Sequence, residues 1–368
     1  MEKEALWAIL HNGFGDGSNR QLMVLLEKKN DPAELLSLSA AGWREKIPGI
    51  NDDLLNRLLQ ASKTADPAKT AEYMQKRHIK MLNFYEEDYP IYLRNIDNPP
   101  PLLYYIGEKF HDEDLRIAMV GSRNCSEYGR KAAFELAKEL SLNGVCIVSG
   151  LARGIDGASQ AGALEGSGGT IAVLGTGVDK IYPAENRQLA NDILAHPKGT
   201  IVSEFPLSAK PLPWHFPLRN RIISGLSDGL AVVEAGVKSG ALISAELALE
   251  QGKEVFAVPG SIFSESSVGC LNLLRDGAKL MATADDVLEE YGMECLPKEK
   301  KPAPKIEEQE LSADEALVLK HIGAEPISID ELGYLTKLQV PRLMSALSML
   351  EINGLVKQLA GMKYLRVG

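Results

Sequence analysis

Short runs of consecutive hydrophobic residues alternate with longer amphipathic stretches between Leu115 and Tyr291. The apolar runs are rich in β-branched residues and predict strands at Ile117–Val120, Val145–Ser149, Ile171–Leu174, Thr200–Val202, Leu230–Val233 and Val255–Val258. The stretches between them predict helices at Ser126–Asn143, Asp156–Glu165, Ala184–Leu194, Asn220–Leu226, Ala241–Gln251 and Val268–Arg275. Nearly continuous apolar strands separated by helices are typical of a parallel sheet covered on both faces. The pattern therefore predicts an α/β fold with a doubly wound, mostly parallel sheet.

The N-terminal part of the chain has a different, wholly helical pattern. It predicts short helices at Glu4–Leu10, Ser18–Lys28, Pro32–Leu36, Ala40–Lys46 and Asp52–Ala61. Within Ile47–Asp52 a Pro-Gly turn precedes a helix N-cap, as in helix-hairpin-helix or SAM-like units. We expect a small SAM-like domain at residues 1–65. Such a unit either contacts DNA backbones or serves only as a packing module, and the sequence leaves both readings open.

Two further segments complete the predicted domain organisation. Between Ile79 and Gly107, proline-containing turns alternate with a short strand, so the sheet domain is expected over 79–293 with its core at 115–291. Residues 294–311 are polar and proline-rich, and predict a linker.

The C-terminal segment, 312–368, predicts three helices followed by a hairpin and therefore a winged-helix domain. The helices are expected at Ala313–Ile322, Ile329–Thr336 and Val340–Asn353. The third helix and its approach carry Lys337 and Arg342 but are otherwise largely apolar. This composition favours docking of a protein over readout of DNA.

The net charge of the chain limits which classes of function are possible. The chain of 368 residues has a net charge of −10, whereas nucleic-acid-binding proteins usually carry a basic excess. A nucleic-acid function therefore requires a local basic site. No apolar run reaches the length of a membrane span, and the N-terminus has no pattern of a secretion signal. The four cysteines are scattered without a CxxC pair, which predicts a cytoplasmic protein without a zinc site.

Chemistry is expected where the predicted strands end, because ligands of doubly wound sheets bind outside the carboxyl ends of the strands. The first strand ends in Gly121-Ser122-Arg123, where backbone amides and a guanidinium can hold a phosphate. The alternative is a plain turn whose arginine pairs with a surface carboxylate. The second strand ends in a turn that contains Gly150, Arg153 and Gly154, followed by Asp156, which we interpret as a structural N-cap.

The third strand is followed by Lys180 and Tyr182, a cation and a ring that suit a phosphate and a stacked base. Packing of the tyrosine in the core explains the pair equally well. The preceding Gly175-Thr176-Gly177 lacks the third glycine of a dinucleotide-binding motif, so no nicotinamide cofactor is expected.

Aromatic and basic residues then gather between Trp214 and Ser224, where Phe216 precedes Arg219-Asn220-Arg221 at the expected start of a helix. Cations are disfavoured at a helix N-terminus, and a bound polyanion would resolve that conflict. A capped surface helix is the alternative. After the fifth strand, Lys238, Ser239 and Gly240 form a further anion-binding turn. Glu234 is interpreted as an ion-pair partner of Arg219 or Arg221, with a catalytic role as the alternative.

Several catalytic motifs are absent from the sequence: the P-loop, HExxH and GxSxG. These absences favour binding over catalysis, so neither enzyme activity nor a cofactor nor a metal is predicted.

Taken in order, these motifs resemble those of the DprA/Smf family. The resemblance covers most of Tyr89–Tyr291 and rests on the following segments: Gly121–Arg123, Ser149–Asp156, Gly175–Gly177, Tyr182-Pro183, Ser203-Glu204, Arg219–Ser224, Val233–Gly236, Ser239-Gly240, Val258–Gly260 and Gly277-Ala278. The chain departs from the expected pattern at Gly269–Asn272, where a polar residue is expected two positions after the glycine.

The resemblance implies a Rossmann-like domain that binds single-stranded DNA, loads the recombinase RecA during natural transformation and forms a homodimer. The DNA-binding residues that it and the strand-end motifs predict are Gly121, Ser122, Arg123, Gly150, Arg153, Gly154, Lys180, Phe216, Arg219, Asn220, Arg221, Lys238, Ser239 and Gly240. The alternative is a nucleotide phosphoribohydrolase-like enzyme on a related fold, for which Glu234 is the candidate catalytic residue.

Overall fold

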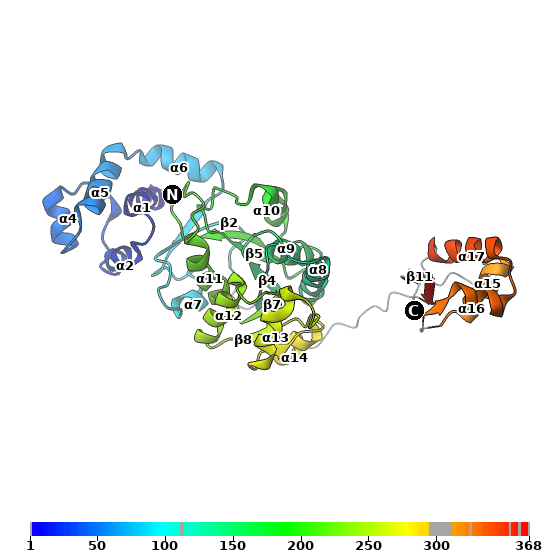
Figure 1. Cartoon of the computed structure of the whole chain (residues 1–368). Helices are drawn as coiled ribbons and strands as arrows, with labels where there is room; N and C mark the ends of the chain where they lie inside the picture. Colours follow the sequence, from blue (N-terminus) through cyan, green and yellow to red (C-terminus); the bar gives the residue numbers. More distant parts are fainter. Residues whose placement is uncertain are drawn as a thin grey trace. The chain divides into compact units, whose positions relative to one another are not determined.

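The computed structural model describes residues 2–110, 114–293, 311–323, 326–352, 355–359 and 362–366. The chain divides into two compact units, residues 1–296 and 297–368, which are coloured blue to yellow and orange to red in Figure 1. The predicted linker at 294–311 lies outside the described residues except for Leu311, and Cys295 lies outside them as well.

Nine strands of the described part of unit 1 form one sheet, in the order β1-β2-β6-β5-β4-β3-β7-β8-β9. Their bounds are β1 Lys80–Asn83, β2 Leu102–Gly107, β3 Arg116–Gly121, β4 Cys146–Ser149, β5 Thr170–Val173, β6 Gly199–Ser203, β7 Gly229–Glu234, β8 Glu254–Ala257 and β9 Lys279–Leu280. All pairs from β6 to β9 are parallel, while β1–β2 and β2–β6 are antiparallel. The chain runs outward from β3 in one direction and then returns to extend the sheet in the other. This arrangement confirms the predicted doubly wound, mostly parallel α/β fold.

Helices cover both faces of the sheet (Figure 1). In the sheet domain they are α7 Ile91–Arg94, α8 Glu127–Leu142, α9 Ile155–Ala163, η1 Ala184–Asn186, α10 Arg187–Ala195, α11 His215–Gly225, α12 Gly240–Glu250, η2 Glu265–Ser267, α13 Val268–Arg275 and α14 Asp285–Glu290. Along β3, Ala118 and Val120 pack in a core with α11 and α12, while Ile117 and Met119 pack in a second core with α8. Successive side chains of a strand point to opposite faces, so burial of both faces explains the continuous apolar runs.

The N-terminal helices pack onto the β1–β2–β6 end of the same sheet. They are α1 Glu2–Phe14, α2 Asn19–Glu27, α3 Pro32–Leu36, α4 Ala40–Lys46, α5 Asp52–Thr64 and α6 Pro67–Lys76. Their apolar side chains share one core with Leu102 and Tyr104 of β2 and Ile201 of β6. The predicted Pro-Gly turn is present, and Asn51 caps α5 by accepting a hydrogen bond from the amide of Leu54 at 2.8 Å. A self-standing domain at residues 1–65 stays a prediction.

Helix α6 was not predicted, although its sequence carries a start signal. The side chain of Asp66 accepts a hydrogen bond from the amide of Lys69 at 3.0 Å, and Pro67 occupies the first helical position. An N-cap aspartate followed by proline is a common helix start. None of the described helices is long and apolar enough to cross a membrane.

Unit 2 is a winged-helix domain, as predicted. Its helices are α15 Ala313–His321, α16 Ile329–Thr336 and α17 Val340–Ile352, and its strands are β10 Ile327–Ser328, β11 Val356–Leu359 and β12 Lys363–Arg366 in the order β10-β12-β11. Arg342 on α17 makes two hydrogen bonds, of 2.7 and 2.8 Å, to the carboxylate of Asp314 on α15. This cation of the third helix is therefore already paired within the domain.

The contact between α1 and β2 makes stability depend on pH. His11 is buried, and its Nδ1 is hydrogen-bonded to the hydroxyl of Tyr104 at 3.0 Å. Burial lowers the pKa of His11 from 6.5 to about 3. Between these values the unfolded chain binds a proton that the folded chain does not, so stability falls as the pH drops below 6.5.

We expect the unfolding free energy of the wild type to fall by about 2 kcal/mol more than that of His11→Gln between pH 7 and 5, at roughly 1.4 kcal/mol per pH unit below the unfolded pKa. Urea denaturation at both pH values measures the difference. His78→Gln, which removes an exposed histidine, should retain the wild-type pH dependence. If the unfolding free energies of the wild type and His11→Gln depend equally on pH, His11 is not the group that makes stability depend on pH.

Candidate nucleic-acid interface

A cavity of about 810 Å³ lies at the carboxyl ends of β3, β4 and β7. Its walls come from the turns that follow these strands, from the loops after β5 and β6, and from helices α11 and α12. Strand β3 has β4 on one side and β7 on the other, so the chain changes direction across the sheet at this point. A crevice of this kind at the switch point is where ligands of doubly wound folds bind.

The turn after β3 presents polar groups to the cavity. The amide of Ser122 donates to the carbonyl of Glu234 at 2.8 Å, which ties this turn to the end of β7. The Ser122 hydroxyl accepts from the amide of Asn124 at 3.2 Å. Arg123 is exposed, and its guanidinium lies 5.0 Å from the ring centroid of Phe216. The turn thus places one solvent-accessible cation above one aromatic ring.

The turn after β4 is fixed by Asp156. Helix α9 begins at Ile155 with Gly154 as its N-cap, so the expectation that Asp156 is the cap was wrong by two positions. Asp156 lies in the first turn, and its carboxylate accepts from the amide of Gly150 at 3.1 Å. Burial raises the pKa of this carboxyl, and the nearby Arg219 opposes that shift. Asp156 thus fixes this turn by a hydrogen bond to the backbone, and it also lines the cavity.

Arg219 is buried, and its guanidinium binds backbone carbonyls at the ends of two strands. Its Nη1 donates to the carbonyl of Gly150 at 2.9 Å and to that of Val173. A Cβ at residue 150 would collide with this guanidinium, which explains why glycine is needed there. Burial lowers the pKa of Arg219 to about 10, so the side chain stays cationic at neutral pH. Arg219 therefore adds positive charge to the cavity wall, although its side chain is buried.

Helix α11 begins at His215, five residues before the predicted start. The run Arg219–Arg221 therefore lies inside the helix, and the predicted conflict between cations and a helix N-terminus does not exist. His215 is fully buried and stacks on Phe205 with ring centroids 3.9 Å apart. Its ring nitrogens contact the carbonyl of Gly175 at 3.0 Å and the carboxylate of Asp16 at 2.9 Å. The loop after α1 thus helps to fix the start of this helix.

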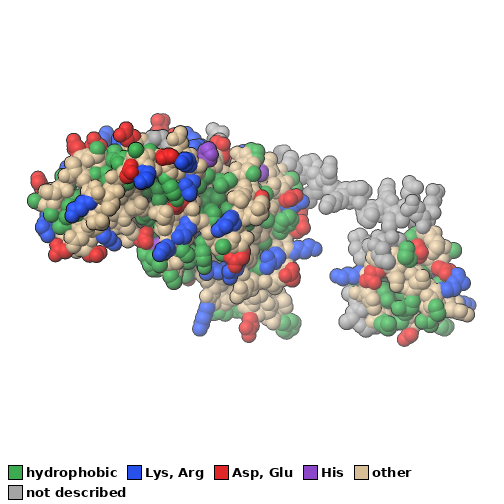
Figure 2. All heavy atoms as spheres, turned by 90° about the horizontal axis from the view of Figure 1, so that it is seen from above, with side chains coloured by type: hydrophobic (Ala, Val, Ile, Leu, Met, Phe, Trp, Pro, Cys, Tyr) green, Lys and Arg blue, Asp and Glu red, His purple; other side chains and the backbone are tan. Residues whose placement is uncertain are grey.

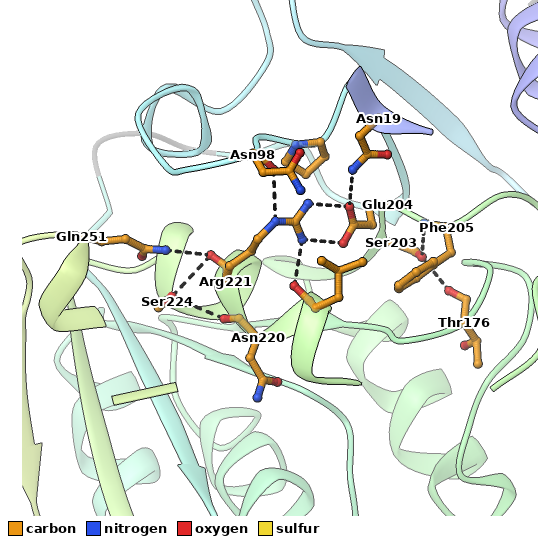
Figure 3. A network of polar contacts seen from close by, with 12 residues as sticks. Asn19, Asn98, Thr176, Ser203, Glu204, Phe205, Asn220, Arg221, Ser224 and Gln251 are labelled. Carbon is orange, nitrogen blue, oxygen red and sulfur yellow. Dashed lines mark hydrogen bonds and ion pairs between the residues drawn. The ribbon is translucent and has the colours of Figure 1, made fainter. Parts of the chain in front are cut away.

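Arg221 points away from the cavity into a buried ion pair, shown in Figure 3. Its two terminal nitrogens donate to the two oxygens of Glu204 at 2.5 and 2.6 Å, and its Nε donates to the carbonyl of Asn98 at 3.0 Å. Asn19 of α2 donates to the same carboxylate at 3.3 Å. Arg221 therefore holds the framework together, and its guanidinium has no free edge for DNA.

Glu234 does not pair with either arginine, so that prediction was wrong. Its carboxylate accepts from the amide of Ser126 at 2.9 Å and from the Ser126 hydroxyl, at the start of α8. Both acceptor oxygens are engaged by the serine that caps the helix. Glu234 is also not among the residues that line the cavity. The partner that the sequence analysis missed is Glu204, which is buried beside Arg221.

Most of the predicted DNA-binding residues come together around the cavity. Those that line it are Gly121, Ser122, Arg123, Phe216, Arg219, Asn220, Lys238, Ser239 and Gly240. The residues outside its lining are Gly150, Arg153, Gly154, Lys180 and Arg221.

Two of the residues outside the lining have structural explanations. Gly154 has φ of +76°, and a Cβ there would collide with the carbonyl of Ser122. Arg153 is exposed and pairs with Glu185. Lys180 is also exposed, beyond the cavity wall. These positions shape the turns or lie outside the cavity.

Tyr182 and Asn124 line the cavity but were not among the predicted site residues. The ring of Tyr182 is 44% exposed and lies 5.8 Å from that of Phe216, so the alternative of a buried packing role was wrong. The pairing of a cation with a ring before Pro183 was the sequence signal for Tyr182. Asn124 follows Arg123 directly, but an asparagine in a turn carries no signal of its own. No group of described His, Cys, Asp and Glu side chains is arranged to hold a metal ion.

Comparison with known proteins shows clear similarities over most of the chain. The family model described as DNA recombination-mediator protein A matches residues 80–292, and that of the DprA winged helix domain matches residues 300–362. Protein Smf of Synechocystis is 33% identical over 382 residues, covering 93% of this chain and 95% of the relative. DNA processing protein DprA of Bacillus subtilis is 44% identical over 225 residues, covering 61% of this chain and 75% of the relative.

Two solved structures extend the similarity to the fold. DNA processing protein A of Streptococcus pneumoniae superposes with a TM-score of 0.65 at 35% identity, covering 79% of this chain and 98% of that one. DNA processing protein A of Helicobacter pylori, whose structure concerns its single-stranded DNA binding mode, has a TM-score of 0.52 at 31% identity. That match covers 58% of this chain and 95% of the other.

The two arginine pairs next to the cavity differ in burial and should differ in their effect on stability. We expect Arg221→Ala to lower the unfolding free energy by about 3–5 kcal/mol, because it leaves the buried carboxylate of Glu204 uncompensated. Arg153→Ala breaks an exposed pair and should cost about 1 kcal/mol or less. Urea denaturation of both variants measures the contrast. A loss below about 1 kcal/mol for Arg221→Ala would contradict the structural role of the buried pair.

Proposed function

The chain belongs to the DNA recombination-mediator protein A (DprA/Smf) family, and from this premise we propose that it binds single-stranded DNA in the cavity at the ends of β3, β4 and β7. As a member of this family it acts in DNA processing and recombination. The proposal extends to loading of RecA onto the bound strand during natural transformation, to homodimer formation and to action in the cytoplasm.

The observation that carries the proposal is the combination of free cations and accessible rings on one cavity wall. Arg123 and Lys238 both line the cavity, are exposed, and make no ion pair within the described residues. The ring of Phe216 lies beside Arg123, and that of Tyr182 lies beside Phe216. Cations bind the phosphates of single-stranded nucleic acid, and rings stack on its unpaired bases.

Backbone donors add to the phosphate-binding capacity. Helix α12 begins beside the cavity at Gly240, and Ser239 caps it by accepting from the amide of Ala241 at 3.3 Å. A Cβ at Gly240 would meet nothing within 4 Å, so the space in front of this helix start is open. The N-terminus of an α-helix favours anions because its amides point outward and its dipole is positive there.

The local basic site accounts for DNA binding by an acidic protein. On the face drawn in Figure 2, basic and acidic side chains are interspersed, in keeping with the net charge of −10. The positive charges that matter are those gathered at the cavity, where Arg219 adds a buried guanidinium to the exposed Arg123 and Lys238. We expect affinity to depend strongly on salt and little on base sequence.

The contacts of Glu234 favour DNA binding over the alternative function, phosphoribohydrolase activity. A catalytic glutamate must reach the substrate, but this carboxylate is buried and engaged by Ser126. In the winged-helix domain, pairing of Arg342 with Asp314 supports docking of a protein rather than DNA readout.

Removal of Arg123, the exposed cation beside the ring of Phe216, should weaken DNA binding. We expect Arg123→Ala to lower the affinity for oligo-dT about 10- to 100-fold, the effect of removing one charge-assisted hydrogen bond. Arg153→Ala removes an arginine outside the cavity wall and serves as the matched control. Fluorescence anisotropy at two salt concentrations, with duplex of equal length for comparison, measures both. Wild-type protein that fails to bind oligo-dT at low salt would refute the proposal.

Base stacking is tested separately at Tyr182. We expect Tyr182→Ala to cost about 1–3 kcal/mol of binding free energy and Tyr182→Phe to retain the wild-type affinity, because stacking needs the ring and not the hydroxyl. The same anisotropy assay gives both values. If the alanine variant binds as tightly as the wild type, the ring does not contact a base.

RecA loading is tested with RecA itself. When oligo-dT is covered by a single-stranded-DNA-binding protein, DNA-dependent ATP hydrolysis by RecA should begin earlier with the wild type than without it. Arg123→Ala should lose most of this acceleration, and Arg153→Ala should keep it. An unchanged lag with wild-type protein that binds DNA would reject the loading function and leave DNA binding in place.

A further inference from the structure

A second cavity, of about 540 Å³, lies apart from the DNA site, between the end of α6, strands β1 and β2, and the loop that follows β5. It shares no lining residue with the cavity at the ends of β3, β4 and β7. Its volume is within the range of pockets that hold small ligands or single side chains, about 300–1,000 Å³. The proposed function does not use this cavity.

The floor of the second cavity is aliphatic. It is formed by Ile106, Val178, Ile181, Leu194 and Ile201. Val178 and Ile201 are buried, while the other three are half-buried and leave apolar surface open to solvent. No Phe, Tyr or Trp side chain is among the described residues that line the cavity. The floor therefore suits an aliphatic group better than a nucleobase, which would require a ring for stacking.

The rim of the cavity is cationic. Arg77, His78 and Lys80 follow one another at the junction of α6 and β1, and all three are exposed. The guanidinium of Arg77 lies 4.0 Å from the ring centroid of Tyr73, and Nζ of Lys80 lies 5.3 Å from that of Tyr105. In the described part of the chain none of the three makes an ion pair.

One carboxylate, that of Asp179, is present in the cavity wall. Tyr73 donates its hydroxyl hydrogen to it at 2.6 Å, and Ser208 donates to it from its amide and hydroxyl at 2.8 and 2.9 Å. These bonds hold Asp179 as a structural link between α6 and the loop after β6. The rim cations are therefore left for a ligand. Figure 2, which looks down on the side of α6 and α10, shows basic, acidic and hydrophobic side chains interspersed there.

We propose that this cavity is a docking site for an acidic peptide segment of a partner protein, with one aliphatic side chain of the peptide in the cavity and its carboxylates on the rim. Charge complementarity carries the choice of occupant. The chain as a whole is acidic, with a net charge of −10, and would repel such a segment except where cations gather. An apolar side chain in the pocket supplies affinity, and the rim charges supply specificity and attraction.

The test uses a fluorescein-labelled peptide of four aspartates followed by two leucines, with the full-length protein. We expect saturable binding at low salt that weakens as salt is raised. Replacing both leucines with serine should weaken binding about tenfold or more, the effect of losing one buried aliphatic side chain. Replacing the aspartates with asparagine should abolish the salt dependence.

Variants of the protein locate the site. The double variant Arg77→Ala/Lys80→Ala should bind the peptide at least about fivefold more weakly at low salt, an effect of two exposed charges. Lys69→Ala/Lys76→Ala removes the same charge from lysines of α6 that pair with Asp66 and Glu72, and should bind as the wild type does. Oligo-dT at saturating concentration should not displace the peptide.

Three results would overturn the proposal: no peptide binding, equal loss in the two double variants, or displacement by oligo-dT with matching loss of DNA binding in Arg77→Ala/Lys80→Ala. The last result would make the rim a nucleic-acid contact. The first two results have no bearing on the DNA site, because the Arg123→Ala assay uses residues of the other cavity.

Discussion

The guanidinium of Arg219 is the group on which the site depends most. It donates to carbonyl oxygens at the ends of β4 and β5, and so joins helix α11 to the edge of the sheet. A buried charge of this kind is costly unless it is hydrogen-bonded and compensated, and the carboxylate of Asp156 nearby supplies part of that compensation. Because the same side chain lines the cavity, the interaction that joins α11 to the strand ends also adds to the electrostatics of the proposed DNA site.

Arg219 and Arg221 are only two positions apart but have different roles. Arg219 faces the cavity and the strand ends, whereas Arg221 pairs with Glu204 on the other side of α11. The N-terminal helices take part in this frame, because Asn19 reaches Glu204 and Asp16 reaches His215 at the first turn of α11. The helix that forms one wall of the site is thus fixed from both the sheet and the N-terminal segment.

Two cavities of unit 1, the proposed DNA site and the second cavity beside α6, present different chemistry on one acidic chain. The first joins exposed cations to aromatic rings, which fits a polyanion with stacking bases, while the second joins cations to an aliphatic floor. Their separation would let the protein hold DNA and a protein partner at the same time. That property fits the proposed loading of RecA onto a bound strand.

The sequence by itself determined the fold class, because burial of both sheet faces leaves continuous apolar runs, and these alternate along the chain with amphipathic helices. It also predicted that Arg123, Phe216 and Lys238 line one cavity, since parallel strands bring their carboxyl ends to one edge. The same reasoning placed Lys180 and Arg221 there, and neither lines the cavity. Only the tertiary structure decided the direction of Arg221, the partner of Glu234 and the true start of α11. These depend on contacts between segments far apart in the chain, and local patterns of hydrophobicity and charge carry no record of such contacts.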